Sequence, residues 1–123
     1  MARLAVVIGD PTGIGPEVLA RALAVPPSDE LLVIGDGAVW QQALDLTGTR
    51  LPARPSSHPE RISATGVPFL DLPANDRGWR LGELSPAAGR ATGTWMERAV
   101  RLALDRFVDG LVFAPLNKQA MIK

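Results

Sequence analysis

The chain of 123 residues contains no cysteine and only one histidine, and these absences exclude several kinds of chemistry. Without cysteine the chain can form no disulfide, no thiolate zinc site and no cysteine nucleophile. With His58 as its one histidine, the chain cannot form a pair of metal-binding histidines. The sequence also shows no Ser-His-Asp set. His58 lies in a polar, proline-containing stretch, where an exposed imidazole without a catalytic role is the usual case.

Net charge and long apolar runs are absent as well. Thirteen basic and thirteen acidic residues cancel, and no long run of one sign occurs. Nucleic-acid binding depends on clustered Lys and Arg, so this class of partner is not expected. No apolar stretch approaches the roughly 20 residues that a membrane helix needs. The N-terminus leads directly into a strand pattern without a cleavable leader. We expect a soluble, cytoplasmic protein with no nucleic-acid or membrane partner.

The most informative stretch is residues 9–18, Gly-Asp-Pro-Thr-Gly-Ile-Gly-Pro-Glu-Val, which follows the apolar run 4–8. Its glycines allow a close approach of the backbone, and Pro16 suits the first position of a helix. Glu17 in the first turn suits the positive end of the helix dipole. A strand, a glycine turn and a helix in this order present backbone N–H groups to a ligand. Asp10 could contact that ligand or form an Asx turn, and a turn that only packs is the alternative.

Short apolar runs alternate with amphipathic helical patterns along the chain. The runs 31–34 and 110–114 predict strands buried on both faces, residues 67–72 predict a strand that Pro68 places at an edge or a strand start, and a short strand is expected near Leu51. Ser85 and Pro86 open the longest helix, and its predicted inner face consists of Ala88, Thr92, Trp95, Met96, Ala99, Val100, Ala103 and Phe107. This order predicts an α/β fold, a mostly parallel sheet with helices on both faces.

A partial dinucleotide fingerprint occurs in the same region. Gly13 and Gly15 follow a strand, and Asp36 comes about 20 residues later. The third glycine is missing, because Val18 occupies its position. We therefore interpret Asp36 as a turn residue that caps the next helix.

Ligands of parallel sheets bind beyond the carboxyl ends of the strands, where the turns 10–15 and 114–118 are both expected. Asn117 and Lys118 lie in the second turn, before a last helix that is expected near Gln119. A lysine beside a helix N-terminus can hold a phosphate or a carboxylate, although a solvated surface lysine is commoner. The residues alone predict an α/β domain with a small anionic ligand.

Three stretches resemble the 4-hydroxythreonine-4-phosphate dehydrogenase family of vitamin B6 biosynthesis. They are residues 9–17, residues 82–85 with Ala88-Gly89, and residues 114–121, Ala-Pro-Leu-Asn-Lys-Gln-Ala-Met. The resemblance implies oxidation of a phosphorylated substrate by NAD or NADP, followed by decarboxylation, and a divalent metal (Zn, Mg or Co) in a homodimer. It also implies a fold similar to that of isocitrate and isopropylmalate dehydrogenases, with an active site between two domains.

The family is much longer than this sequence, and its metal-binding histidines come after the segment that matches Lys123. Residues 1–123, in which no internal boundary is expected, therefore resemble the N-terminal α/β portion of a two-domain enzyme, inactive alone. No catalytic or metal-binding residue is assigned to them. The residues that the family motifs assign to substrate binding are Asp10, Gly13, Gly15, Asn117 and Lys118.

Other functions stay open at this point. Members of the wider family oxidise 4-phosphorylated threonate or erythronate, or aromatic cis-dihydrodiols such as that from terephthalate, and the residues present do not distinguish these substrates. A third hypothesis is a module that binds a phosphorylated metabolite without turning it over.

Overall fold

The computed structural model describes residues 2–25, 30–49, 54–56, 68–80 and 82–115. The elements follow in the order β1 (Arg3–Val7), α1 (Gly15–Ala22), β2 (Glu30–Gly35), α2 (Gly37–Thr47), β3 (Arg54–Ser56), β4 (Pro68–Asp71), α3 (Pro86–Leu104) and β5 (Gly110–Phe113). The predicted helix near Gln119 and the predicted position of His58 lie outside the described residues.

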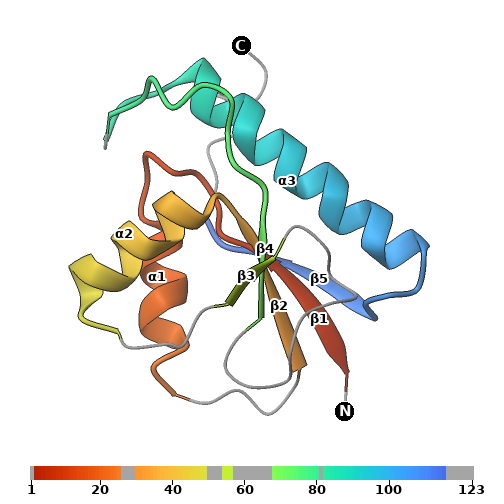
Figure 1. Cartoon of the computed structure of the whole chain (residues 1–123). Helices are drawn as coiled ribbons and strands as arrows, with labels where there is room; N and C mark the ends of the chain where they lie inside the picture. Colours follow the sequence, from red (N-terminus) through yellow and green to blue (C-terminus); the bar gives the residue numbers. More distant parts are fainter. Residues whose placement is uncertain (1, 26–29, 50–53, 57–67, 81, 116–123) are drawn as a thin grey trace.

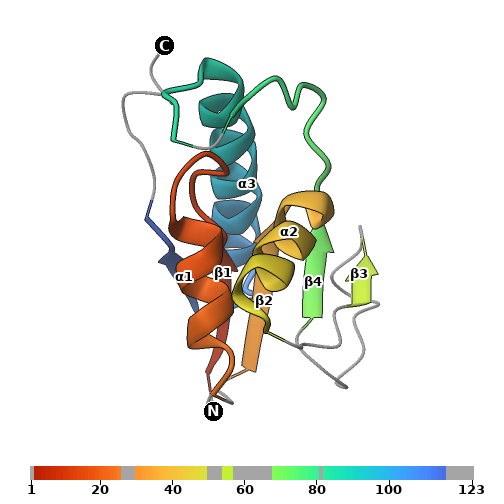
Figure 2. The same ribbon diagram turned by 90° about the vertical axis from the view of Figure 1, so that its left-hand side faces the viewer.

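The five strands of the described residues form one sheet in the order β3-β4-β2-β1-β5, and every neighbouring pair is parallel. Helices α1 and α2 cover one face of this sheet and α3 crosses the other (Figure 1). The predicted α/β fold with helices on both faces is confirmed. The strands point upward in Figure 2, and their carboxyl ends lie on the side of the sheet at which α1, α2 and α3 begin.

Two short strands appear near their predicted positions. The strand expected near Leu51 is β3, which begins at Arg54. The strand expected at 67–72 is β4, and Pro68 is its first residue. Because β4 lies between β3 and β2, the alternative of a strand start is confirmed and that of an edge strand is wrong. A missing N–H is tolerated at the first position of a strand.

The core fills both faces of the central strands. Ala5, Val7 and Ile34 are fully buried between the helical layers. On the face of α2, Trp40 stacks on Phe69 with ring centroids 5.9 Å apart. Burial of large aromatic side chains of this kind is a main source of folding free energy.

Most of the predicted inner face of α3 is confirmed. Ala88, Thr92, Trp95 and Ala99 are buried, and the Trp95 indole Nε1–H donates to the Leu72 carbonyl at 3.0 Å. Val100 is 42% exposed, so its predicted burial is wrong. The helix turns by about 100° per residue, and the positions that continue the buried stripe are Ala99 and Leu102. Phe107 lies beyond the end of α3, although it packs partly against the core.

The prediction that β5 is buried on both faces is also wrong. Val112 is 44% exposed and Phe113 is 39% exposed. Within the described part of the chain, β5 pairs with β1 alone and forms an edge of the sheet. An edge strand lacks a neighbour whose side chains could shield its own, which explains the exposure.

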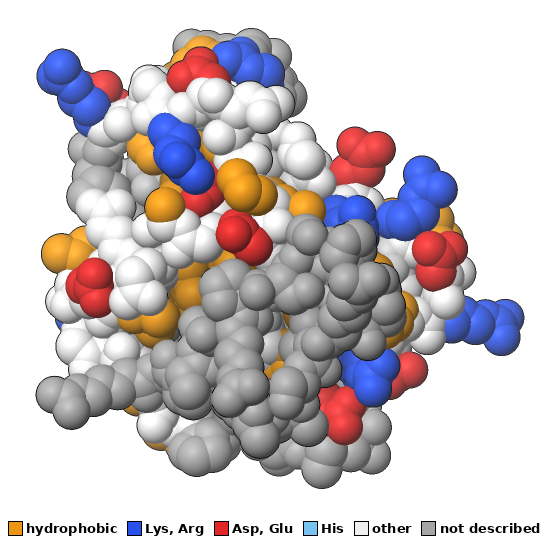
Figure 3. Space-filling model, in the orientation of Figure 1, with side chains coloured by type: hydrophobic (Ala, Val, Ile, Leu, Met, Phe, Trp, Pro, Cys, Tyr) orange, Lys and Arg blue, Asp and Glu red, His pale blue; other side chains and the backbone are white. Residues whose placement is uncertain are grey.

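The helix ends follow the sequence signals. The Asp36 carboxylate accepts a hydrogen bond from the Ala38 N–H at 2.8 Å and caps α2, as predicted. The Ser85 Oγ accepts from the Ala88 N–H at 3.2 Å and caps α3, and Gly48 ends α2. Among the described residues, no helix is both long and apolar enough to cross a membrane. Basic and acidic side chains are interspersed on the described part of the face in Figure 3.

Candidate functional site at the carboxyl ends of the strands

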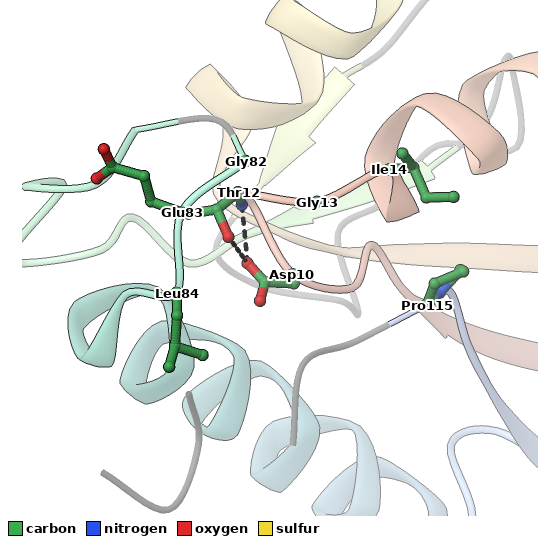
Figure 4. Close-up of a pocket in the computed structure, with 8 residues that line it drawn as sticks. All are labelled: Asp10, Thr12, Gly13, Ile14, Gly82, Glu83, Leu84 and Pro115. Carbon is green, nitrogen blue, oxygen red and sulfur yellow. Dashed lines mark hydrogen bonds between the residues drawn. The ribbon is translucent and has the colours of Figure 1, made fainter. Parts of the chain in front are cut away.

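A hollow of about 280 Å³ lies beyond the carboxyl ends of β1 and β5. Its walls come from three segments that are far apart in the sequence: residues 10 and 12–14 of the β1–α1 turn, residues 82–84 before α3, and Pro115 after β5 (Figure 4). This is the edge at which parallel α/β sheets bind their ligands. The sequence predicted this edge, and the two predicted turns meet there at Pro115.

The Pro115 carbonyl fixes the β1–α1 turn through the main chain. It accepts a hydrogen bond from the Asp10 N–H at 3.1 Å. A Cβ atom at Gly9 would lie 2.4 Å from this oxygen, and one at Gly15 would lie 2.6 Å from it. Gly9 also has a φ of +87°, a conformation that other residues rarely adopt. Both positions therefore require glycine, because the two turns approach each other too closely for a side chain.

Asp10 holds the turn from inside. Its side chain is 4% exposed, and its Oδ1 accepts from the Thr12 N–H at 2.8 Å and from the Thr12 hydroxyl at 2.6 Å. Its carbonyl accepts from the Gly13 N–H at 3.1 Å. The Asx turn, one of the two predicted roles of Asp10, is confirmed. A direct contact of Asp10 with substrate stays a prediction.

The opposite wall belongs to the segment between β4 and α3, residues 72–85, here called the β4–α3 segment; residue 81 is outside the described part. Figure 2 shows it arching over the carboxyl ends of the strands toward the start of α3. The Gly82 N–H donates to the Thr12 carbonyl at 2.7 Å and joins the two walls. The Glu83 side chain points away from Asp10 and Thr12 (Figure 4).

Asp36 anchors the β4–α3 segment at its other end. Its side chain is fully buried, and Oδ2 accepts from the Ala74 N–H at 2.9 Å and from Arg77 Nε at 2.8 Å. Arg77 Nη2 also donates to Oδ1 at 3.3 Å. Burial disfavours the charged carboxylate, but the hydrogen bonds from Arg77, Ala74 and Ala38 and the charge of Arg77 outweigh it and hold the pKa of Asp36 below its usual value.

These contacts show whether Asp36 could be the ribose-binding carboxylate of a dinucleotide fingerprint. A carboxylate that binds the ribose of a dinucleotide must be accessible, whereas the Asp36 carboxylate is buried and accepts four hydrogen bonds from protein groups. The interpretation of Asp36 as a structural residue is therefore supported. The β1–α1 turn does not fit a nicotinamide dinucleotide held through the usual fingerprint.

The predicted substrate-binding residues differ in their position relative to the hollow. Asp10 and Gly13 line the hollow. Gly15 is buried at the start of α1, against the Pro115 carbonyl. Asn117 and Lys118 lie outside the described residues. The prediction missed Thr12, Ile14, residues 82–84 and Pro115 as lining residues, although all of them lie in the three motifs on which the resemblance rests.

The described lining contains two acidic side chains, those of Asp10 and Glu83, and no basic one. The described residues also contain no group of three His, Cys, Asp or Glu side chains that could hold a metal ion. The divalent metal therefore does not fit the described part of this segment. The described lining therefore offers no cation to an anionic ligand, and a contact of Lys118 with such a ligand stays a prediction.

The fold is that of a parallel α/β protein with a glycine turn and a hollow at the carboxyl edge of its sheet, the edge at which such sheets bind ligands. Residues 28–123 match the model of a family described as the pyridoxal phosphate biosynthetic protein PdxA, and the chain belongs to that family. It is 38% identical to a D-threonate 4-phosphate dehydrogenase of Cupriavidus necator, with 96% of this chain and 37% of the relative covered. It is 37% identical to a 4-hydroxythreonine-4-phosphate dehydrogenase of a Synechococcus species, over 98% of this chain and 34% of the relative.

A solved structure has the same fold. The crystal structure of a 4-hydroxythreonine-4-phosphate dehydrogenase from Burkholderia phymatum superposes with a TM-score of 0.90 at 28% identity. The match covers 99% of this chain and 38% of that protein. The chain thus spans little more than a third of the length of the relatives that it matches.

Proposed function

We propose that the protein to which this chain belongs is a nicotinamide-dependent dehydrogenase of 4-hydroxythreonine 4-phosphate in the synthesis of pyridoxal phosphate. Membership of the PdxA family is the observation that carries the proposal. Relatives named as dehydrogenases and a fold match at a TM-score of 0.90 support it. In this proposal residues 1–123 are the N-terminal part of a two-domain, cytoplasmic homodimer.

The proposed reaction removes a hydride and a proton from the secondary alcohol next to the phosphate-bearing carbon. NAD or NADP accepts the hydride. The resulting ketone lies β to the carboxylate, which leaves as carbon dioxide; the ketone takes up the electron pair as an enolate, and a proton from solvent then replaces the carboxylate. A divalent metal (Zn, Mg or Co) belongs to the proposal, but its ligands are not among the described residues, so no step on this segment is assigned to it.

The proposed task of this segment is to hold one end of the substrate. The first turn of α1 lies beside the hollow, and a helix N-terminus has N–H groups without intrahelical acceptors and a positive dipole end. Two hydrogen bonds from Thr12 to the Asp10 carboxylate hold the β1–α1 turn that precedes this helix. Lys118 would supply the positive charge that the described lining lacks. Together these groups would bind a phosphate or a carboxylate.

A second substrate is favoured by one specific observation. Relatives at 38% and 36% identity are named D-threonate 4-phosphate dehydrogenases. D-threonate 4-phosphate has a hydroxyl where 4-hydroxythreonine 4-phosphate has an amine, and both carry an alcohol β to the carboxylate. The same oxidation and the same anion contacts serve either substrate, so the described segment is compatible with both.

The test is turnover by the full-length protein, purified with added Zn²⁺, Mg²⁺ or Co²⁺ and assayed with NAD⁺ and NADP⁺. The proposal predicts reduction of the nicotinamide that depends on 4-hydroxythreonine 4-phosphate. Faster turnover of D-threonate or D-erythronate 4-phosphate assigns the protein to the second substrate class. Turnover of an aromatic cis-dihydrodiol alone contradicts the proposal. Saturable binding of the phosphorylated acids without reduction of nicotinamide identifies a binding module.

A further inference from the structure

The β4–α3 segment begins at Leu72, whose N–H donates to the Gly35 carbonyl at 2.8 Å, and beyond Leu72 it is attached near the carboxyl edge of the sheet at two further points. At the first, the buried Asp36 carboxylate binds the Ala74 N–H and the Arg77 guanidinium. At the second, the Gly82 N–H donates to the Thr12 carbonyl. Gly82 lies only five positions after Arg77, so the position of the first attachment limits where the second can form. Residues 82–84, which follow directly, are one wall of the hollow.

The contact of Arg77 with Asp36 is directional. Nε donates at 2.8 Å to one carboxylate oxygen and Nη2 at 3.3 Å to the other. A planar guanidinium that meets both oxygens fixes the orientation of the side chain as well as its distance. The Arg77 side chain is half exposed, whereas the Asp36 side chain is completely buried. The arginine therefore reaches inward from the surface to a carboxylate that already caps α2.

A buried ion pair of this kind adds little net stability, because the loss of hydration of the carboxylate offsets the attraction between the charges. Apolar packing would hold the segment on the core as firmly, and Leu72, Ala74 and Trp79 already pack against it. The pair supplies a fixed geometry that apolar packing does not supply.

We propose that Arg77 is a positioning residue: its two hydrogen bonds to Asp36 set the place of residues 82–84 against the β1–α1 turn and so the width of the hollow. Arg77 does not line the hollow and acts through the segment. The expected change in KM rests on the proposed function. The expected change in the position of residues 82–84 rests on the structure alone.

The kinetic test compares Arg77→Met with Arg90→Met in the full-length protein. Arg90 is the matched control, because it also pairs with an aspartate of the segment, Asp76, but at 3.9 Å with both side chains 64% exposed. A displaced wall weakens substrate binding, so Arg77→Met is expected to raise KM for the phosphorylated substrate about tenfold and to change kcat less than about twofold. Arg90→Met is expected to leave both constants unchanged. Arg77→Lys, which keeps the charge and loses the two-point contact, is expected to give an intermediate KM.

The conformational test is amide hydrogen exchange, which needs no turnover. In Arg77→Met the Gly82 amide is expected to exchange at least about tenfold faster, while the β2 amides keep their protection. If the protein turns over no offered substrate, the proposed function fails, but the Gly82 exchange still tests the positioning. If Arg77→Met does not fold, the double variant Asp36→Asn/Arg77→Met removes both charges and is compared instead.

The proposal predicts that the double variant folds, exchanges at Gly82 quickly and, in an active enzyme, keeps the raised KM. Wild-type Gly82 exchange in either folded variant would overturn the inference. An equal rise of KM in Arg90→Met would overturn it as well, because the effect would then follow the loss of any arginine that pairs with the segment.

Discussion

The two walls of the hollow are held in place by different forces. The β1–α1 turn is fixed by the main chain, since the Pro115 carbonyl lies 2.4 Å from the place of a Cβ at Gly9 and 2.6 Å from that of a Cβ at Gly15. Beyond Leu72 the β4–α3 segment is held by Asp36, which pairs with Arg77 and accepts from the Ala74 N–H, and by the hydrogen bond from the Gly82 N–H to Thr12. Steric contacts do not depend on pH, whereas an ion pair does. One wall is therefore held by close main-chain packing, whereas the other depends in large part on charge.

Among the substitutions considered, Gly9→Ala is expected to disrupt the β1–α1 turn most strongly. The new methyl group would lie 2.4 Å from the Pro115 carbonyl, and alanine would have to adopt a φ of +87°. We expect a loss of about 3 kcal/mol in the free energy of unfolding, from the overlap and the backbone strain together. Chemical denaturation measures it.

Gly93→Ala is the matched control, because a Cβ at Gly93 in α3 would meet nothing within 4 Å. It should stabilise the protein by about 0.5–1 kcal/mol, the usual gain for alanine over glycine in a helix. Equal effects of the two substitutions would mean that the turn is not sterically fixed.

The second wall should respond to Asp36→Asn. The asparagine side chain has the shape of the aspartate but no charge. Its NH2 group would face N–H donors, with which it cannot form hydrogen bonds. We expect a loss of about 2 kcal/mol at neutral pH, because a buried charged hydrogen-bond network is broken. Asp76→Asn, on the exposed pair of the same segment, should change the stability by less than about 0.5 kcal/mol.

The pH dependence of this effect has a definite sign. The pKa of Asp36 is lowered in the folded protein, so its contribution is fully present above the unfolded value of about 3.8 and is lost as the pH falls through the lower folded value. The difference in unfolding free energy between wild type and Asp36→Asn should therefore be constant near neutrality and shrink below about pH 4. A difference that grows on acidification would contradict the charge-based anchor.

A smaller effect is expected from Lys118, which lies outside the described residues. Lys118→Ala in the full-length protein should raise KM for the phosphorylated substrate about tenfold, because the described lining carries no positive side chain. Stability should not change. Steady-state kinetics measure the effect, and unchanged KM and kcat would remove Lys118 from the substrate site.

The smallest effect concerns a residue far from both walls. Arg106, two residues after α3, has a φ of +60°, which glycine adopts more easily. We expect Arg106→Gly to stabilise the protein by about 0.5 kcal/mol, because relief of the strain exceeds the extra entropy of the unfolded chain. Arg101→Gly within α3 should instead destabilise it by about 1 kcal/mol. Thermal unfolding of both variants checks the contrast.

Local signals predicted much of the fold. Ser85 with Pro86, Asp36 and Gly48 marked helix ends through interactions within a few residues, and all three are confirmed. Burial was harder to predict, because it depends on neighbours distant in the sequence. Val112 and Phe113 belong to an apolar run that is typical of an internal strand, yet β5 lies at an edge of the described sheet.

The site was predicted in part for the same reason. The glycine turn was visible as a motif, and the general rule for parallel sheets placed it beside the turn at Pro115. The pairing of Asp36 with Arg77 joins residues 41 positions apart, and no spacing in the sequence indicates it. The opposite wall at 82–84 was recognisable as a motif but not as a wall, because its place depends on that pair.

We propose that the phosphorylated substrate binds in the hollow between the two walls. Amide hydrogen exchange of the full-length protein, with and without 4-hydroxythreonine 4-phosphate or D-threonate 4-phosphate, tests it most directly. The account predicts slower exchange at residues 12–15 and 82–84 when the substrate that is turned over is bound, with no change in α2. Saturating substrate that leaves both segments unchanged would contradict the account.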